Sequence, residues 1–515
     1  MRYPPHWNTI TIGESLGLIN GRAFKPNEWT KAGMPIIRIQ NLNNPEAHFN
    51  HYEGDLPEKF LVQNGDLLFA WSGTPGTSFG AHLWRGGNAW LNQHIFRITF
   101  SSDQFDKKFL QLAINQNLQE YVRIAHGGAG LAHITKKMFE ASVLPSPSLA
   151  EQKRIVAKIE ELFSELDEGV ANLKKARAQL AVYRQALLKH AFEGRLTAEW
   201  RAQHADELES AEELLERIRA EREERYQQQL KTWEKALKIW EADSKKADKP
   251  SKPRVPLVAQ LPTQQELDKL PGLPAGWHWM RLGSCNTDVF DGPFGSHLKT
   301  SDYVGSGIRV VRLENIGVMK FIEEKESFIT EAKYRTLVEH TVVPGDIVFS
   351  SFITERTRVA MVPPTIDKAV NKADCFCVRC QGTVLMNRYA TIVLSTRSTF
   401  KQLEDAVHGV GRPRINTTQL KELLIPVCSP AEQQELMNQV DAQFSEIDAL
   451  EADIDQNLQR AEALRQSILN KAFAGELVPQ DGADEPAAAL LARIHAEREA
   501  QAGKSKTPKT RSKKA

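Results

Sequence analysis

Two long stretches of the chain carry apolar residues at coiled-coil spacing. Within 148–194 the apolar positions alternate steps of four and three residues, with one interruption at Gly169. They are Ile155, Ile159, Leu162, Leu166, Leu173, Ala176, Leu180, Tyr183 and Leu187. Within 429–475 the register recurs at Leu436, Val440, Ile447, Leu450, Ile454, Ala461, Leu464 and Ile468. This spacing predicts two long helices. A single such helix could pack on its own domain, but two matched copies favour pairing with each other.

Both stretches have start and stop signals for a helix. Ser148-x-x-Glu151 and Ser429-Pro430-x-Glu432 have the form of capping boxes, the second with proline at the first helical position. Gly194 and Gly475 are suited to the left-handed residue that ends many helices. The pattern therefore predicts helices over most of 148–194 and 429–475, each about 60 Å long at 1.5 Å per residue.

The remaining segments differ in pattern. Residues 1–147 and 276–428 contain short β-rich apolar runs separated by Gly, Asn and Pro, which predicts two small mixed α/β domains. For residues 195–275 the composition predicts a charged helical insertion followed by a proline-rich linker. For residues 476–515 it predicts a short helix and a basic disordered tail. The overall fold class is α+β.

The chain repeats itself. Residues 130–196 align with 411–477 at one offset of 281, without a gap. Shared features include Ala-Glu-Gln at 150 and 431, Phe-Ser-Glu at 163 and 444, and Ala-Phe-x-Gly at 191 and 472. Upstream the match is looser, as between IIRIQNL at 36–42 and VVRLENI at 310–316. The sequence therefore predicts a tandem duplication of a variable domain followed by a long helix.

Composition narrows the class of protein. Hydrophobic residues are 41%, charged residues 25%, and the formal net charge is +1, which is typical of a globular chain and excludes a strongly basic one. No apolar run reaches the length of a membrane span, and no export signal is evident at the first residues. The five cysteines are odd in number and all lie in the second half, which favours a reducing compartment. We therefore expect a cytoplasmic protein.

Catalytic motifs were not found. The chain has no phosphate-binding loop, no glycine fingerprint for a nucleotide cofactor, and no Asn/Asp-Pro-Pro-aromatic signature of amino-methylating enzymes. Cys375-x-Cys377-x-x-Cys380 could suggest zinc, but zinc requires four ligands and no second pair exists. Cys375 and Cys377 fit one buried strand face better. We expect no catalytic residue, no metal and no cofactor in this chain.

Polar residues that end strands or lie in glycine-bearing loops are candidates for DNA contact. They are Arg38, Gln40, Asn41, Ser72, Thr74, Thr77, His126, His133 and Lys136 in the first domain, and Arg312, Glu314, Asn315, Thr354, Arg356, Arg358, Arg412, Arg414 and Asn416 in the second. Two alternatives remain open: an arginine and asparagine that only hold a turn, and loops that are merely flexible. Trp71, Trp84 and Trp90 favour core positions over base stacking.

With its order of variable domain, long helix, variable domain, long helix, the chain resembles the DNA specificity subunit of type I restriction-modification systems. GMPIIRIQNL and GDLLFA, with GSGIRVVRLENI and GDIVFS, look like that family's target-recognition domains. The resemblance implies that each globular domain reads one half of a split DNA site. It also implies a pseudo-twofold arrangement with an antiparallel coiled coil that binds two methyltransferase subunits.

The resemblance further implies that separate motor-nuclease subunits cut DNA. Methyl donor, ATP and magnesium would then belong to those partners. The charged insertion departs from the bare pattern. Alternatives are a DNA-binding coiled-coil protein with another partner, a scaffold without DNA contact, and a standalone methyltransferase or nuclease, which would need the motif that was not found.

Overall fold

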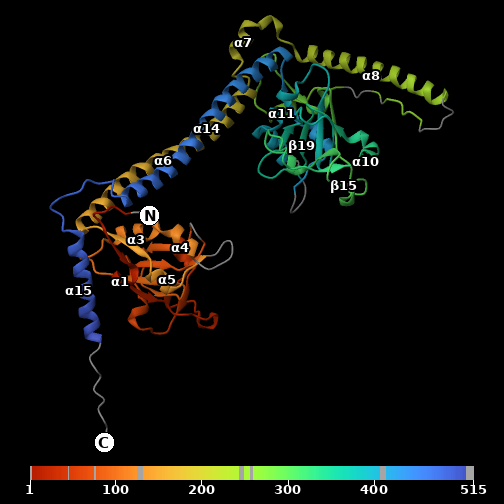
Figure 1. Ribbon diagram of the computed structural model, residues 1–515. Coiled ribbons are helices and arrows are strands. Elements are labelled where there is room, and N and C mark those ends of the chain that lie inside the picture. Colours follow the sequence, from red (N-terminus) through yellow and green to blue (C-terminus); the bar gives the residue numbers. More distant parts are fainter. Residues whose placement is uncertain are drawn as a thin grey trace. The chain divides into compact units, whose positions relative to one another are not determined.

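The computed structural model describes residues 3–44, 46–74, 77–124, 132–242, 249–253, 255, 259–405, 407 and 413–505. These residues divide into two compact units (Figure 1). Unit 1 comprises Met1–Lys174 and Ile454–Ala515, and unit 2 comprises Lys175–Asp453. Each unit therefore contains one globular domain together with parts of both long helices. Among the described residues, no helix is long and apolar enough to cross a membrane.

Unit 1 contains two four-stranded sheets, with orders β2-β10-β6-β8 and β4-β3-β9-β5, and two short strand pairs, β1-β12 and β11-β7. The strands are β1 (Asn8–Thr11), β2 (Gly17–Asn20), β3 (Met34–Ile37), β4 (Asn50–Tyr52), β5 (Leu61–Val62), β6 (Leu67–Ala70), β7 (Ser72–Gly73), β8 (Gly80–Leu83), β9 (Ala89–Leu91), β10 (Ile95–Thr99), β11 (Ala132–His133) and β12 (Val143–Ser146). The helices of this domain are α1 (Ile12–Ser15), α2 (Ile39–Asn43), α3 (Lys107–Gln116), α4 (Leu118–Ile124) and α5 (Lys136–Glu140), with 3-10 turns η1 (Pro26–Glu28) and η2 (Glu58–Phe60).

Unit 2 repeats this architecture in a four-stranded sheet β14-β22-β19-β20, a five-stranded sheet β15-β17-β16-β21-β18 and the pair β13-β23. The strands are β13 (His278–Arg281), β14 (Thr287–Phe290), β15 (Tyr303–Val304), β16 (Ile308–Val311), β17 (Phe328–Ile329), β18 (Thr341–Val342), β19 (Ile347–Ser350), β20 (Val359–Met361), β21 (Ala369–Asn371), β22 (Cys375–Cys380) and β23 (Leu424–Val427). The helices and 3-10 turns are α9 (Gln264–Leu267), α10 (Glu331–Arg335), α11 (Asn387–Leu394), α12 (Arg397–Glu404), α13 (Thr417–Glu422), η4 (Leu282–Ser284), η5 (Thr300–Asp302), η6 (Leu313–Asn315) and η7 (Val338–His340).

Strand pairing shows that the two domains share one fold. In unit 1, β10 lies antiparallel between β2 and β6, and β3 pairs parallel with β9. In unit 2, β22 lies antiparallel between β14 and β19, and β16 pairs parallel with β21. The expected duplication and the α+β class are confirmed. Cys375 and Cys377 of β22 pack in an apolar cluster of unit 2, as the strand-face interpretation expected.

The long helices are α6 (Leu149–Phe192) and α14 (Pro430–Phe473), each of 44 residues. In unit 1 the Arg465 guanidinium lies 4.5 Å from the centre of the Phe163 ring and pairs with Asp167. In unit 2 Arg184 lies 4.8 Å from the centre of the Phe444 ring and pairs with Asp448. Adding 281 to Arg184 gives Arg465, and adding 281 to Phe163 and Asp167 gives Phe444 and Asp448. The two sets of contacts are therefore the same, with the roles of the two helices exchanged. Such a repeat is what an antiparallel coiled coil of duplicated helices requires.

The helix ends agree with the predicted signals, apart from one detail. The Ser148 and Ser429 hydroxyls accept the backbone N–H of Glu151 and Glu432, at 3.1 and 3.3 Å. Gly194 and Gly475 have φ of 70° and 73°. The predicted return bond from each glutamate to its cap is wrong, because the carboxylates bind other partners. Glu151 accepts the Trp7 indole N–H at 2.9 Å, and Glu432 accepts the Arg201 guanidinium at 2.5 Å.

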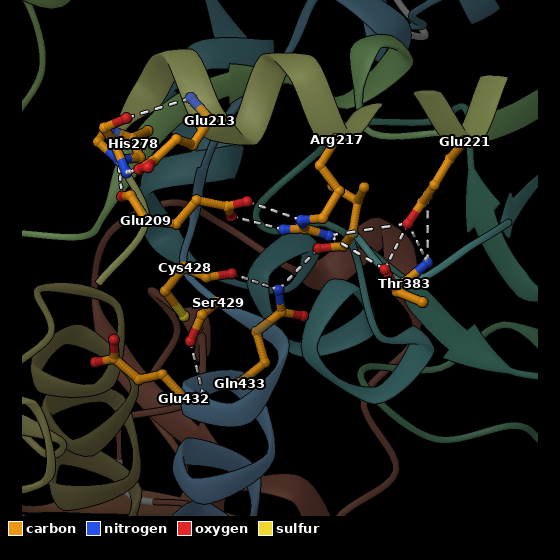
Figure 2. A network of polar contacts seen from close by, with 12 residues as sticks. Glu209, Glu213, Arg217, Glu221, His278, Thr383, Cys428, Ser429, Glu432 and Gln433 are labelled. Carbon is orange, nitrogen blue, oxygen red and sulfur yellow. Dashed lines mark hydrogen bonds and ion pairs between the residues drawn. The ribbon is translucent and has the colours of Figure 1, made fainter. Parts of the chain in front are cut away.

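A buried glutamine fixes the start of each long helix to its own domain. The Gln433 amide donates to the Cys428 and Val384 carbonyls at 2.9 Å each, as Figure 2 shows for the Cys428 bond, and accepts the Met386 N–H at 3.0 Å. In unit 1, Gln152 donates to the Pro147 and Gln104 carbonyls and accepts the Asp106 N–H. These bonds explain why Ala-Glu-Gln recurs at both helix starts.

The charged insertion begins with α7 (Ala198–Gln203) and η3 (Ala205–Glu207), and its longest element is α8 (Ala211–Ala242). Leu214, Leu215 and Ile218 of α8 are buried in the core of unit 2. Arg217 of α8 donates to the Glu209 carboxylate at 2.7 Å and to the Thr383 hydroxyl at 3.2 Å (Figure 2). The repeat of this helix, α15 (Ala487–Ser505), buries Leu490 and Ile494 in unit 1. Each globular domain is thus completed by the helix that follows the other domain in the sequence. The basic tail from Lys506 lies outside the described residues.

Candidate nucleic-acid interface

Arg38 and Arg312 stand at equivalent strand ends, after β3 and β16. The N–H of each donates to an asparagine three residues later, Arg38 to Asn41 at 3.0 Å and Arg312 to Asn315 at 2.8 Å. Both asparagines are fully buried, and their amide groups donate to backbone carbonyls, that of Ala47 in unit 1 and those of Ile322 and Lys325 in unit 2. The turn-holding alternative therefore fits Asn41 and Asn315, and we correct their assignment as DNA contacts.

The two arginine side chains remain accessible. Arg38 lies 5.4 Å from the centre of the Trp29 ring. Arg312 lies 5.7 Å from the centre of the Tyr303 ring and 3.1 Å from the Glu314 carboxylate, with the Arg312 side chain 40% exposed. The partly exposed guanidiniums are held in place by aromatic rings, which suits contact with a base or a phosphate. The exposed Gln40 donates to the His48 carbonyl at 3.0 Å.

The predicted loop residues of unit 1 fall into two groups. Thr74 and Thr77 are exposed, whereas Ser72 is buried in β7, where it pairs with His133 of β11. His133 itself is exposed. Lys136, at the start of α5, donates to the Leu18 carbonyl at 3.1 Å and lies 3.6 Å from Glu140. His126 lies outside the described residues.

In unit 2, Thr354 and Arg356 are exposed, which keeps them available for contact. Arg358 is engaged within the protein, because it donates to the Ser350 hydroxyl and the Leu313 carbonyl at 3.1 Å each. Asn416 caps α13, and its side chain accepts the Gln419 N–H at 2.9 Å. Arg414 remains half-exposed. Arg412 lies outside the described residues.

Trp84 and Trp90 are core residues, as expected, but Trp71 is only partly buried. Its ring centre lies 5.2 Å from that of His94 and 4.7 Å from that of His133. Burial, followed by the nearby charges of His133 and Arg38, lowers the pKa of His94 below its usual value, so the neutral form predominates at pH 7. The structure thus gathers Arg38, His133 and two residues outside the predicted set.

In unit 2 the Arg414 guanidinium lies 3.4 Å from the Asp374 carboxylate and 4.9 Å from the centre of the Phe352 ring. Asp374 was also not predicted. His94 and Asp374 each directly precede a buried strand, so a search for polar residues at strand starts would have found both.

Comparison with known proteins agrees with this duplicated architecture. Residues 4–175 match the family model described as the type I restriction modification DNA specificity domain. The EcoBI specificity subunit of a type I restriction enzyme of Escherichia coli is 26% identical over 97% of this chain and 94% of that protein. The chain is thus similar to specificity subunits of type I restriction enzymes over nearly its whole length.

The similarity to further specificity subunits and solved structures also extends over nearly the whole chain. The MjaVIII specificity subunit of Methanocaldococcus jannaschii is 18% identical over 93% of this chain and 94% of its own length. A chain from a study of complex assembly and conformational transition in the type I R-M system has a TM-score of 0.61, at 16% identity, covering 92% of this chain and all of that one. The HsdS subunit from Thermoanaerobacter tengcongensis has a TM-score of 0.50 at 17% identity, covering 92% of this chain and 98% of its own. The fold of the specificity family is shared along both repeats.

Proposed function

We propose that this chain recognises a two-part DNA sequence, one half with each globular domain, as the specificity subunit of a type I restriction-modification complex. The observation that carries the proposal is that two domains of one fold present different side chains at equivalent surface positions. At the offset of 281, the exposed His133 of unit 1 corresponds to the half-exposed Arg414 of unit 2. Two readers of different sequences need one scaffold with different contacts.

The long helices support a second role as a scaffold for two methyltransferase subunits and the restriction subunits. Large apolar side chains remain exposed on these helices at Val182 and at Tyr183, Leu450 and Leu464, three positions that the spacing had assigned to the apolar seam. Exposed apolar residues on a helix pair favour burial against another protein. Partner chains would also supply much of the phosphate contact, because the two domains carry only a small excess of basic residues.

A domain exchange tests the proposed readout. We expect that replacing residues 1–147 with the matching domain of another specificity subunit changes one half of the modified site. The replacement should keep Trp7, whose indole binds Glu151 of α6, so that the new domain docks on its helix. Methylation-site sequencing in cells that carry the hybrid and its methyltransferase gives the result. A change in both halves would show that the domains do not read independently.

We further propose that the chain alone is not an enzyme and that methyl donor, ATP and magnesium are used by its partners. The purified chain, supplied with all three, should neither methylate nor cut DNA. The reconstituted complex is the positive control. Turnover by the isolated chain at a rate that survives repeated purification would contradict this proposal and favour a standalone methyltransferase or nuclease.

A further inference from the structure

One backbone frame recurs at the surface of both domains. In unit 1 the Trp71 N–H donates to the His94 carbonyl at 3.3 Å, and the Ile134 N–H donates to the Trp71 carbonyl at 3.0 Å. In unit 2 the Ser351 N–H donates to the Asp374 carbonyl at 2.9 Å, and the Ile415 N–H donates to the Ser351 carbonyl at 3.0 Å. The two hydrogen bonds connect equivalent backbone positions in the two domains. Trp71 therefore corresponds to Ser351, and His94 corresponds to Asp374.

The third position of the frame also corresponds. His133 pairs with Ser72 in an antiparallel strand pair of unit 1, and Arg414 forms an antiparallel bridge with Phe352 in unit 2. His133 directly precedes Ile134 and Arg414 directly precedes Ile415, and both isoleucines are buried. The backbone is thus the same in both domains, while the three side chains that it carries differ completely in chemistry.

In unit 1 the three side chains form an aromatic group. The Trp71 ring is T-shaped against His133, with 4.7 Å between the ring centres. Within the described part of the chain, the Trp71 indole N–H and the His94 Nδ1 are buried without a hydrogen-bond partner. Buried polar atoms without a partner are uncommon in proteins and call for an explanation, such as a ligand. The ionisable groups that influence His94 are His133 and Arg38.

In unit 2 the same positions form a charged group. The Asp374 carboxylate accepts the Ser351 hydroxyl at 3.0 Å and lies 3.4 Å from Arg414. The Arg414 side chain is 52% exposed, and Phe352 supports one face of its guanidinium at 4.9 Å. Asp374 has φ of 72°, a conformation that is uncommon for residues other than glycine and that recurs at functional sites. This conformation aims a carboxylate at an arginine that still has donors directed to solvent.

We propose that His133 in unit 1 and Arg414 in unit 2 select bases of the two half-sites, positioned by Trp71 and His94 in one domain and by Ser351 and Asp374 in the other. The proposal rests on the proposed function and names the side chains responsible. An arginine fixed by a carboxylate and a ring presents a planar pair of donors, which matches guanine O6 and N7 in the major groove. Arg414 therefore reads a G·C pair, and Asp374 is the residue that positions it. The group in unit 1 reads its base without a charged arginine.

Arg414→Ala and Asp374→Asn test unit 2. Asparagine tolerates the left-handed backbone of Asp374 but removes the charge that holds Arg414. We expect both variants to relax the same G·C position, with discrimination reduced roughly tenfold to a hundredfold, since one bidentate contact accounts for about that much. The readouts are methylation-site sequencing with the partner methyltransferase and equilibrium DNA binding by the reconstituted complex at two salt concentrations.

His133→Ala tests unit 1 and should relax one position of the other half-site only. In each experiment the half-site read by the unmutated domain is an internal control. Arg397→Ala is a matched control for Arg414, because Arg397 is also exposed and lies 4.6 Å from the centre of the Phe400 ring, on α12. This control should leave both half-sites unchanged.

Three outcomes would overturn the proposal. One is an unchanged motif and affinity in Arg414→Ala and His133→Ala. Another is equal loss on cognate and random DNA with a shallower salt dependence, which indicates phosphate contact. The third is relaxation at different positions by Asp374→Asn and Arg414→Ala. In each case a wild-type complex that still modifies a two-part site leaves the proposed function intact, whereas failure of the wild type to do so would refute that function itself.

Discussion

At the scale of single residues, the two glutamates at the long-helix starts have a larger role than capping. Glu432 is fully buried, and its carboxylate accepts the Thr197 hydroxyl at 2.6 Å as well as the Arg201 guanidinium. Glu151, at the equivalent position, is 3% exposed and accepts the Trp7 indole and, at 2.7 Å, the Gln480 amide. Each carboxylate thus joins a helix start to the chain that follows the opposite helix.

Arg201→Ala should destabilise unit 2 strongly. The Arg201 side chain is 11% exposed, and removing it leaves the Glu432 carboxylate buried without its counter-charge. Loss of one partner from such a pair costs about 3–5 kcal/mol. Hydrogen exchange measured by mass spectrometry can report the two units separately.

Two further variants make this prediction specific. Arg195→Ala removes an exposed partner of Glu193 and should cost at most about 1 kcal/mol. Combining Arg201→Ala with Glu432→Gln should recover part of the lost stability, because the uncompensated charge is removed. Equal protection in Arg201→Ala and wild type would show that the pair contributes little.

At this scale the sequence does not reveal which polar side chains stay exposed and which become buried after folding. Arg-x-x-Asn at 38 and 312 has the composition of a base-reading pair, but the asparagines are buried and complete a turn. Their burial depends on carbonyls six to ten residues away, such as that of Lys325, which no local pattern reveals. His94 and Asp374 can be found as polar residues at strand starts, but their role depends on partners about 40 residues further along the chain, which that local pattern does not reveal.

At the scale of elements, a helix that follows each long helix in the sequence completes the globular domain of the other repeat. Leu490 and Ile494 of α15 lie in one apolar cluster with Trp7 and Ile10, from the first residues of the chain. Leu214 and Ile218 of α8 do the same with Trp277 and Met280 of unit 2. The charged insertion is therefore partly structural, and its repeat closes the first domain.

Ending the chain after Glu485 should destabilise unit 1, because it removes two fully buried side chains. Burial of each contributes about 1.5–3 kcal/mol, so a loss of several kcal/mol is expected. Leu490→Ala removes only one of these buried side chains and should lower the free energy of unfolding by about 2–5 kcal/mol. Urea unfolding of the purified variants, followed by hydrogen exchange, gives the size and place of the change.

A chain ended after Ser505 is the matched control, since it keeps α15 and loses only the basic tail. Its stability should equal that of the full chain. Loss of protection in unit 2 rather than unit 1 after the longer truncation would contradict the observed packing of α15.

Element boundaries show which patterns are local. The coiled-coil spacing, capping serines and closing glycines predicted 148–194 and 429–475, and the helices are Leu149–Phe192 and Pro430–Phe473. A heptad pattern and a cap are written within a few turns, so they can be read from the sequence. The return of α15 to the first domain depends on contacts with residues almost 500 positions away, and no periodicity encodes that choice.

At the scale of the whole molecule, both long helices are continuous from one unit into the other. The boundary between the units falls after Lys174 in α6 and after Asp453 in α14, near the middle of each helix. We therefore expect the length of the coiled coil to set the unspecified gap between the two half-sites.

Adding one heptad to each helix, opposite one another near their middles, keeps the apolar seam in register. Seven residues at 1.5 Å lengthen the pair by about 10 Å, or roughly three base pairs at 3.4 Å each. Both half-site sequences should stay unchanged, because the domains that read them are unaltered. The gap should grow by about that amount, limited by the extra rotation that three base pairs impose on the second half-site. Methylation-site sequencing in cells with the lengthened chain and its methyltransferase measures the gap.

A control variant replaces one existing heptad by a different heptad of equal length with apolar residues at the same seam positions. This control separates the effect of helix length from the effect of helix sequence. That variant should keep the original gap, because the rise of the helix depends on the number of residues and not on their identity. A lengthened chain that still modifies the original gap would show that the DNA or the partner subunits fix the spacing. A lengthened chain that modifies nothing, while the replacement remains active, would mean that the rotation cannot be absorbed. Ten or eleven added base pairs, one full turn of DNA, would then be the next length to test, at about 35 Å or roughly 23 helical residues.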